Sequence, residues 1–210
     1  MADIKNKLDS LLISPAAKET SAIIGKFAES CDSVLEFGTR GGTSGLILLN
    51  ALIAKQHKWK PRFVGVDLVA DDTIKMLDNL ANSNGISFQF VRTHTSQYPI
   101  HETDLLLWDT FHAGGSLLTD LKRLSPFVSK YIVILGYQSF GVHSEAIVNK
   151  LIISAVAAEL GIDENGAKMG IKEGITKFLE FTHEWKIAKE FCEICILERK
   201  TKFTEGLFKA

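Results

Sequence analysis

The sequence predicts an α/β fold in which a mostly parallel sheet is covered by helices on both faces. Five short apolar runs alternate along the chain with stretches of helical periodicity, an order typical of a parallel sheet. Two further runs near the end lie close enough in sequence to pair as a C-terminal β-hairpin. The length of 210 residues suits one full-sized hydrophobic core. We therefore expect a single domain at 31–210, preceded by a helical lead-in at 1–30.

The strands are predicted from short apolar runs that stop at glycine, at aspartate or at a polar segment. The five that alternate with helices cover 33–38, 63–68, 87–91, 103–109 and 130–135. The closing pair covers 185–188 and 191–199. Because ligands of open parallel sheets bind beyond the carboxyl ends of the strands, functional side chains are expected where the first five runs end.

The helices are predicted where apolar residues recur three and four positions apart. In the lead-in, Ser14-Pro15 divides this pattern into two helices, because proline cannot continue a helix. The later helices cover 43–55, 72–83, 117–124, 145–160 and 173–182. The segment 161–170 is predicted to be a glycine-punctuated loop.

The charge balance favours a small ligand over a polyanionic partner. The chain carries 24 Lys and Arg against 25 Asp and Glu, a net charge of −1. It therefore lacks the positive field that attracts nucleic acid or an anionic membrane. The start of the sequence has no signal-peptide pattern, and no apolar stretch is long enough to span a bilayer. We expect a cytoplasmic protein with a small-molecule partner, and a homodimer is left open.

The three cysteines, Cys31, Cys192 and Cys195, are too few for a disulfide framework, which is consistent with a reducing compartment. Cys192 and Cys195 have the C-x-x-C spacing of redox and zinc sites. Because 191–197 is predicted to be a strand, the two thiols are expected to point to opposite faces. We therefore expect structural cysteines here.

The turn after the first strand is the candidate cofactor site. Gly38 and Gly42 let the backbone approach a ligand closely, and Gly41 can adopt positive φ. Glu36 adds a carboxylate beside the turn. Arg40 occupies the position of the second glycine in the G-x-G-x-x-G pattern. This substitution disfavours a dinucleotide, and with it a nicotinamide oxidoreductase.

Asp67, at the end of the second strand, is the candidate ribose-binding residue. Its two carboxylate oxygens can accept hydrogen bonds from both hydroxyls of a ribose. The alternative is a structural role as a solvated strand end or a helix N-cap. The partnership of Asp67 with the glycine-rich turn favours the binding role and an adenosine-containing ligand.

In these segments the sequence resembles the class I S-adenosylmethionine-dependent methyltransferases. Within that class it is most similar to the metal-assisted O-methyltransferase and cephalosporin hydroxylase-like group. The matching stretches are VLEFGTRGGTS at 34–44, FVGVD at 63–67, DLLLWDTFH at 104–112 and KYIV at 130–133, with further similarity at 174–181, 184–186 and 194–199. The resemblance covers about 34–200 and implies a Rossmann-like, seven-stranded sheet with one antiparallel strand.

The resemblance also implies roles for individual residues. The cofactor-binding residues would be Glu36, Gly38, Thr39, Arg40, Gly42 and Thr43 at the methionyl part, Asp67 at the ribose, and Thr95 and Ser96 at the adenine edge. Asp109 would lie beside the sulfonium and the substrate. His112, three residues further on, would be the catalytic base, with Asp109 as the other candidate. The alternative for His112 is a residue at a helix N-terminus that makes a local hydrogen bond.

The sequence departs from this group after the fifth strand. The group carries a His-Asp pair there, whose carboxylate helps to hold a divalent metal, whereas this chain has Leu135 and Gly136. Magnesium prefers several oxygen ligands in an octahedral arrangement, so Asp109 with water would hold it weakly. We therefore expect S-adenosyl-L-methionine as the cofactor and no metal site.

The expected function is S-adenosylmethionine-dependent methyl transfer, with a small-molecule or sugar hydroxyl as the acceptor. Methyl transfer needs orientation, closeness and a group that removes the proton of the nucleophile, which His112 or Asp109 can supply without a metal. The alternative is a methyltransferase fold that has lost catalysis and acts as a cofactor-binding or scaffold protein, which Gly136 favours. No motif in the sequence identifies the acceptor.

Overall fold

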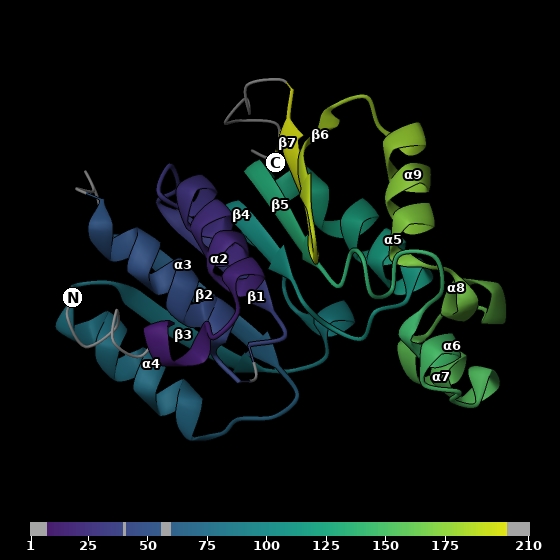
Figure 1. Cartoon of the computed structure of the whole chain (residues 1–210), viewed down its shortest axis with the longest axis horizontal. Coiled ribbons are helices and arrows are strands. Elements are labelled where there is room, and N and C mark those ends of the chain that lie inside the picture. The colour runs from purple at the N-terminus through teal and green to yellow at the C-terminus, as the bar shows by residue number, and fades with distance from the viewer. Residues whose placement is uncertain (1–7, 40, 56–59, 201–210) are drawn as a thin grey trace.

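The structure is a computed structural model that describes residues 8–39, 41–55 and 60–200. In these residues seven strands form one sheet with the order β3-β2-β1-β4-β5-β7-β6 (Figure 1). The strands are β1 (Ser33–Phe37), β2 (Arg62–Asp67), β3 (Ser87–Arg92), β4 (Thr103–Trp108), β5 (Val128–Leu135), β6 (Trp185–Phe191) and β7 (Ile194–Arg199). Strands β1 to β5 pair in parallel, whereas β7 is antiparallel to both β5 and β6. The predicted fold class is confirmed.

Successive residues of the central strands face opposite layers of helices. Val34 and Leu105 pack with α2 (Pro15–Ala28), α3 (Thr43–Ala54) and α4 (Asp72–Ser83). Their neighbours Leu35 and Leu106 pack with α5 (Gly114–Leu124) and α9 (Ile171–Phe181) on the other face. Because both faces are covered, these strands read as continuous apolar runs.

Helix α3 has no polar stripe because it is enclosed by its neighbours. Residues 44–49, 51 and 52 are all buried, and α3 packs against both α2 and α4. A helix that is apolar on every side belongs in a protein core. Each of its fully buried leucines contributes about 1.5–3 kcal/mol through the burial of apolar surface.

The break in the lead-in and the bounds of α4 agree with the sequence prediction. Residues 8–11 are helical, while the first seven residues of the predicted lead-in lie outside the described part of the chain. Ser14 caps α2 by accepting a hydrogen bond from Ala17 N at 3.1 Å, and Pro15 is the first residue of the helix. Helix α4 has the predicted bounds, and Gly85, with φ of 73°, follows its end.

The predicted helix at 145–160 is wrong, because the chain forms two short helices there. These are α6 (Glu145–Val148) and α7 (Ile153–Leu160). Helix α6 ends after one turn, where Lys150 adopts a φ of 54° and Leu151 N donates to Ala146 O at 2.8 Å. The apolar spacing is continuous across this break, so the sequence pattern does not reveal it.

The predicted loop at 161–170 is also corrected, since it contains α8 (Glu164–Lys168). Asp163 caps this helix, with its Oδ1 accepting from Gly166 N at 2.6 Å. Helix α8 packs on α5, which begins at Gly114, three residues earlier than predicted. A Cβ at Gly115 would lie 2.4 Å from Gly166 Cα, so glycine permits this contact. Figure 1 shows α6, α7 and α8 grouped beside α5.

The closing hairpin turns at Cys192 and Glu193, so the predicted strand from 191 begins three residues too early. Cys192 has a φ of 44° and is exposed, whereas Cys195 is buried in β7. Both thiols are free. The expectation that both thiols lie on one strand and point to opposite faces is therefore wrong, because Cys192 lies in the turn; the absence of a redox or zinc role stays a prediction.

No helix in the described part of the chain combines the length and the apolar character that crossing a bilayer requires.

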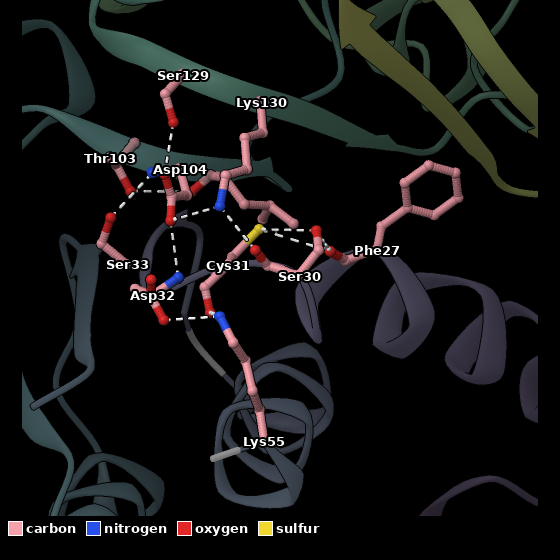
Figure 2. Close-up of polar contacts among 11 residues, drawn as sticks. Phe27, Ser30, Cys31, Asp32, Ser33, Lys55, Thr103, Asp104, Ser129 and Lys130 are labelled. Carbon is pink, nitrogen blue, oxygen red and sulfur yellow. Dashed lines mark hydrogen bonds and ion pairs between the residues drawn. The ribbon is translucent and has the colours of Figure 1, made fainter. Parts of the chain in front are cut away.

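Asp104 links the amino ends of β1, β4 and β5 (Figure 2). Its carboxylate accepts hydrogen bonds from Asp32 N at 2.7 Å, from Ser129 Oγ at 2.5 Å and from Lys130 Nζ at 3.1 Å. Lys130 Nζ also donates to Ser30 O at 2.7 Å. This network ties the segment between α2 and β1 to the neighbouring strands, at the edge opposite to their carboxyl ends.

We predict that Asp104→Ala lowers the free energy of unfolding by about 1–3 kcal/mol, because it leaves several donors around a half-buried carboxylate unsatisfied. Urea unfolding of the wild-type protein and the variant measures the change. Asp78→Ala, at an exposed position of α4, is the control and should change it by no more than about 0.5 kcal/mol. Equal effects of the two substitutions would show that the Asp104 network is not stabilising.

Candidate active site

A cavity of about 460 Å³ lies beyond the carboxyl ends of β1, β2 and β4. The predicted residues that line it are Gly38, Asp67, Thr95, Asp109 and His112. Its other walls are Val66, Leu68, Thr93, His94, Thr110, Phe111, Ser116, Phe140, Glu145, Glu159 and Leu160. Parallel strands bring their carboxyl ends to one edge of a sheet, and this edge is where the sequence places the site.

At Gly38, in the cavity wall, the backbone of the turn after β1 lies directly against the segment that follows β4. Gly38 N donates to Val66 O at 2.9 Å, and Asp109 N donates to Phe37 O at the same distance. Gly38 has a φ of 89°, and a Cβ there would lie 1.7 Å from Asp109 O. Only glycine fits between the end of β1 and the segment that follows β4.

The rest of the glycine-rich turn leads the chain into α3. Gly41 and Gly42 have positive φ, and Thr43 is the first residue of the helix. Thr39 is buried and packs against β2, where a Cβ at Gly65 would lie 2.7 Å from Thr39 Oγ1. The predicted cofactor contacts of Thr39, Gly42 and Thr43 stay predictions. Arg40 lies outside the described residues.

Glu36 is fully buried, and among the described residues neither of its carboxyl oxygens has a hydrogen-bond partner. Burial raises the pKa of Glu36 to about 8, and the carboxylates of Asp109 and Asp67 contribute to the increase. The hydroxyls of Ser44 and Thr39 lie close by and reduce the increase, but neither makes a well-aligned hydrogen bond. Burial therefore favours the protonated acid at Glu36, and its predicted contact with a cofactor stays a prediction.

Asp67 has a structural role at the end of β2 and also lines the cavity, while its predicted contact with a ribose stays a prediction. Its Oδ1 accepts a hydrogen bond from Val69 N at 3.0 Å, which makes a local turn at the end of β2. The same side chain lines the cavity beside Leu68. A structural role in the turn is therefore compatible with a ligand contact.

A buried carboxylate on α5 holds the wall at Thr95, in the short helix η1 (Thr95–Gln97). Asp120 Oδ2 accepts from Thr95 Oγ1 at 3.3 Å and from Trp108 Nε1 at 3.0 Å. Arg123 donates to Thr95 O at 2.6 Å and to Tyr98 O at 3.1 Å. Thr95 is thus fixed from both its side chain and its backbone.

Ser96, the other residue predicted at the adenine edge, turns toward its neighbour His94. The Ser96 hydroxyl and His94 Nδ1 are 2.8 Å apart, and Ser96 N donates to the same ring nitrogen at 3.3 Å. His94 itself lines the cavity. The sequence gives no signal for His94, because a histidine beside a Thr-Ser pair carries no recognisable pattern.

His112 lies between two carboxylates. Its Nδ1 is 3.1 Å from Glu145 Oε2, and its Nε2 is 3.4 Å from Asp109 Oδ1. The second contact is within ion-pair range but is not aligned as a hydrogen bond. Burial lowers the His112 pKa, but Asp109 and Glu145 outweigh it and raise the pKa above the ordinary 6.5.

This geometry changes the pH range expected for His112 as a base. The sequence alone supplies only the reference pKa of about 6.5, which places the rise in rate across roughly pH 5.5 to 7.5. Because both carboxylates favour the protonated ring, the rise moves to higher pH. The assignment of His112 and Asp109 as catalytic residues stays a prediction.

Gly136, which replaces the expected metal ligand, packs directly against His112. Gly136 has a φ of 72°, and a Cβ there would lie 2.2 Å from His112 Cδ2 and 2.5 Å from His112 Nε2. An aspartate at this position would need the volume that the imidazole now fills. The described residues include no group of three or more His, Cys, Asp or Glu placed to hold a metal ion. The expectation that no metal is used stays a prediction.

Glu145 and Phe140, which the sequence does not predict as site residues, complete the surroundings of His112. Phe140 stacks on the imidazole with ring centroids 4.7 Å apart, and Glu145 begins α6. Both follow β5, more than twenty residues after His112 in the chain. Only the Ser144-Glu145 pair, typical of a helix start, gave a local signal, and it predicts a helix rather than a contact.

Solved methyltransferases share this fold. The O-methyltransferase TomG from Streptomyces achromogenes, in complex with S-adenosylmethionine, has a TM-score of 0.52 at 13% identity, over 90% of this chain and 81% of that chain. An O-methyltransferase from Bacillus cereus, in complex with S-adenosylhomocysteine, has a TM-score of 0.52 at 12% identity, over 95% of this chain and 90% of that chain. The magnesium protoporphyrin IX methyltransferase ChlM from Synechocystis, with bound S-adenosylhomocysteine, has a TM-score of 0.56 at 13% identity, over 93% of this chain and 91% of that chain.

The likeness to these proteins is one of fold. No protein-family model matches the sequence, and no curated protein matches it either. The chain therefore has the class I methyltransferase fold, as the resemblance implied.

We predict that Gly38→Ala destabilises the protein more than Gly41→Ala. Both glycines have φ above 80°, so each substitution costs about 1–2 kcal/mol in backbone strain. A Cβ at Gly41 meets nothing within 4 Å, whereas one at Gly38 strikes Asp109 O and costs about 1–3 kcal/mol more. Urea unfolding of both variants measures the two losses in the free energy of unfolding, and their difference gives the cost of the clash with Asp109 O. Equal losses would mean that the turn and the segment after β4 are not in tight contact.

Proposed function

We propose that the protein is an S-adenosylmethionine-dependent methyltransferase that methylates a hydroxyl of a small molecule or sugar. The observation that carries this proposal is the cavity at the carboxyl edge of the sheet, where Gly38 brings β1 against Asp109 and Asp67 stands at the end of β2. The solved structures that share the fold support it, since three of them hold S-adenosylmethionine or S-adenosylhomocysteine.

The charge of the cavity suits a cationic ligand. Its lining contains the carboxylates of Asp67, Asp109, Glu145 and Glu159, and no lysine or arginine among the residues that the structure describes. When bound, S-adenosylmethionine supplies an activated methyl group on a positively charged sulfur. In the proposal Asp67 accepts hydrogen bonds from the ribose hydroxyls, and Asp109 lies beside the positive charge.

The residues around His112 supply the remaining requirements of the reaction. His112 Nε2 accepts the proton of the acceptor hydroxyl, and Asp109 stabilises the imidazolium that forms. Phe111 and Phe140 add apolar walls that orient an acceptor and exclude water. The proposed reaction uses no metal.

A second candidate function is a cofactor-binding or scaffold protein without catalysis. It is favoured by the position of His112, because both ring nitrogens face carboxylates that raise its pKa and so oppose the neutral form that a base requires. Cofactor binding without methyl release from any acceptor would support this second function over the first.

A cytosolic location is part of the proposal. It is supported by three free cysteines, of which Cys31 and Cys195 are buried. Burial raises the pKa of each of these two thiols to about 12, so neither forms a reactive thiolate near neutral pH.

We predict that S-adenosylmethionine binds and that Asp67→Ala weakens binding by about 1.5–3 kcal/mol, the range for lost hydrogen bonds to a charged group. Isothermal titration calorimetry with S-adenosylmethionine and S-adenosylhomocysteine measures both affinities. Asp78→Ala, at an exposed position of α4 outside the cavity lining, is the matched control and should bind normally. Unchanged affinity in a folded Asp67→Ala protein would remove the ribose assignment.

We predict that His112→Ala reduces the methyl-transfer rate by about two to four orders of magnitude, the usual contribution of a general base. Because the base must be neutral, the wild-type rate should rise with pH and reach half its maximum above pH 6.5. A methyl-release assay across a panel of hydroxyl acceptors, with and without a chelator, measures both effects. His112→Ala with full turnover and the wild-type pH profile would show that His112 is not the base.

A further inference from the structure

Glu145 makes three contacts with one residue, His112. Glu145 Oε2 accepts from His112 Nδ1 at 3.1 Å and from His112 backbone N at 3.1 Å. Glu145 N in turn donates to His112 O at 2.8 Å. The first residue of α6 therefore holds both the backbone and the ring of His112.

The other sides of the imidazole are also occupied. Phe140 stacks on it with an interplanar angle of 22°, and Trp108 meets it edge-on with centroids 5.9 Å apart. Gly136 lies so close to Cδ2 and Nε2 that no Cβ fits between them. These contacts hold the plane of the ring, while the hydrogen bond of Nδ1 with Glu145 selects which nitrogen faces α6. Nε2 is then the nitrogen that lies beside Asp109.

We infer that Glu145 is a positioning residue that holds His112 in one orientation and one tautomer, with the proton on Nδ1 and with Nε2 beside Asp109. A neutral histidine whose Nδ1–H donates to a carboxylate has its lone pair on Nε2, which is the atom a base requires. The inference rests on the proposed function only in naming His112 as the base. The contact and its effect on His112 exist without any ligand.

The same contact makes the protonation of His112 depend on α6. The charged groups that face the ring are Asp109, after β4, and Glu145, on α6. Each favours the imidazolium, so removing the charge of either one should lower the pKa of His112. Glu145→Gln is the informative variant, because its amide oxygen can still accept from Nδ1 while the charge is lost.

The test is a pH titration of the histidine rings by NMR on protein labelled with ¹⁵N and ¹³C at histidine, without cofactor. The His112 signals are assigned by their loss in His112→Gln. In Glu145→Gln the His112 pKa should fall, because one of the two carboxylates that favour the imidazolium is lost, with the proton of the neutral ring still on Nδ1. In Glu145→Ala the pKa should fall and the neutral ring should populate both tautomers.

Glu159→Gln is the matched control, since Glu159 also lines the cavity but makes no contact with His112 among those described. It should leave the His112 titration close to that of the wild-type protein. An unchanged His112 pKa in Glu145→Gln, or an equal fall in Glu159→Gln, would overturn the inference. Failure of S-adenosylmethionine to bind would refute the proposed function alone, because the titration uses neither cofactor nor activity.

Discussion

The backbone of the turn after β1 and that of the segment after β4 approach so closely that residue 38 has no room for a Cβ. Asp109 N bonds to Phe37 O, and Gly38 N bonds to Val66 O on the other side, so three strand ends meet at this point. This contact sets the positions of the ends of β1, β2 and β4 relative to one another. Asp67 follows β2 and Asp109 follows β4, and the cavity opens between them.

The sequence predicts the parts of the fold whose signals are local. Short apolar runs that stop at glycine, at aspartate or at a polar segment predict β1 to β4 to within a residue or two, and the bounds of α4 agree with its cap and its terminal glycine. These signals are local. Burial on both faces of a strand selects apolar residues over a few positions, and the unpaired backbone groups at a helix end select the residues of the cap. The outline of a parallel sheet with a closing hairpin follows from their order alone.

The region after β5 could not be predicted in the same way, because contacts distant in sequence set its structure. The break between α6 and α7 depends on Lys150 adopting a left-handed conformation, while the apolar spacing continues through it. Helix α8 forms where Gly114 N bonds to Met169 O and where glycines on α5 and α8 touch. The glycines in 161–170 are typical of a loop, and the sequence of this segment alone does not show that one of them packs against α5. The same difference applies to the candidate site. Asp67 and Asp109 could be predicted because they follow predicted strands, whereas Glu145 could not, because it comes from the region after β5.

Gly136 and His112 are two aspects of one packing arrangement. The sequence presents Gly136 as a missing carboxylate, which would weaken a metal site and with it the case for catalysis. The structure adds that the volume beside Gly136 is filled by the His112 ring, and that a side chain at 136 would expel it. Glu145 then binds the far nitrogen of that ring, and Phe140 covers its face. A chain that kept an aspartate at 136 could not hold His112 in this position, so the same glycine that removes a metal ligand makes room for a candidate base. The departure from the resembling group is therefore no evidence by itself that catalysis has been lost.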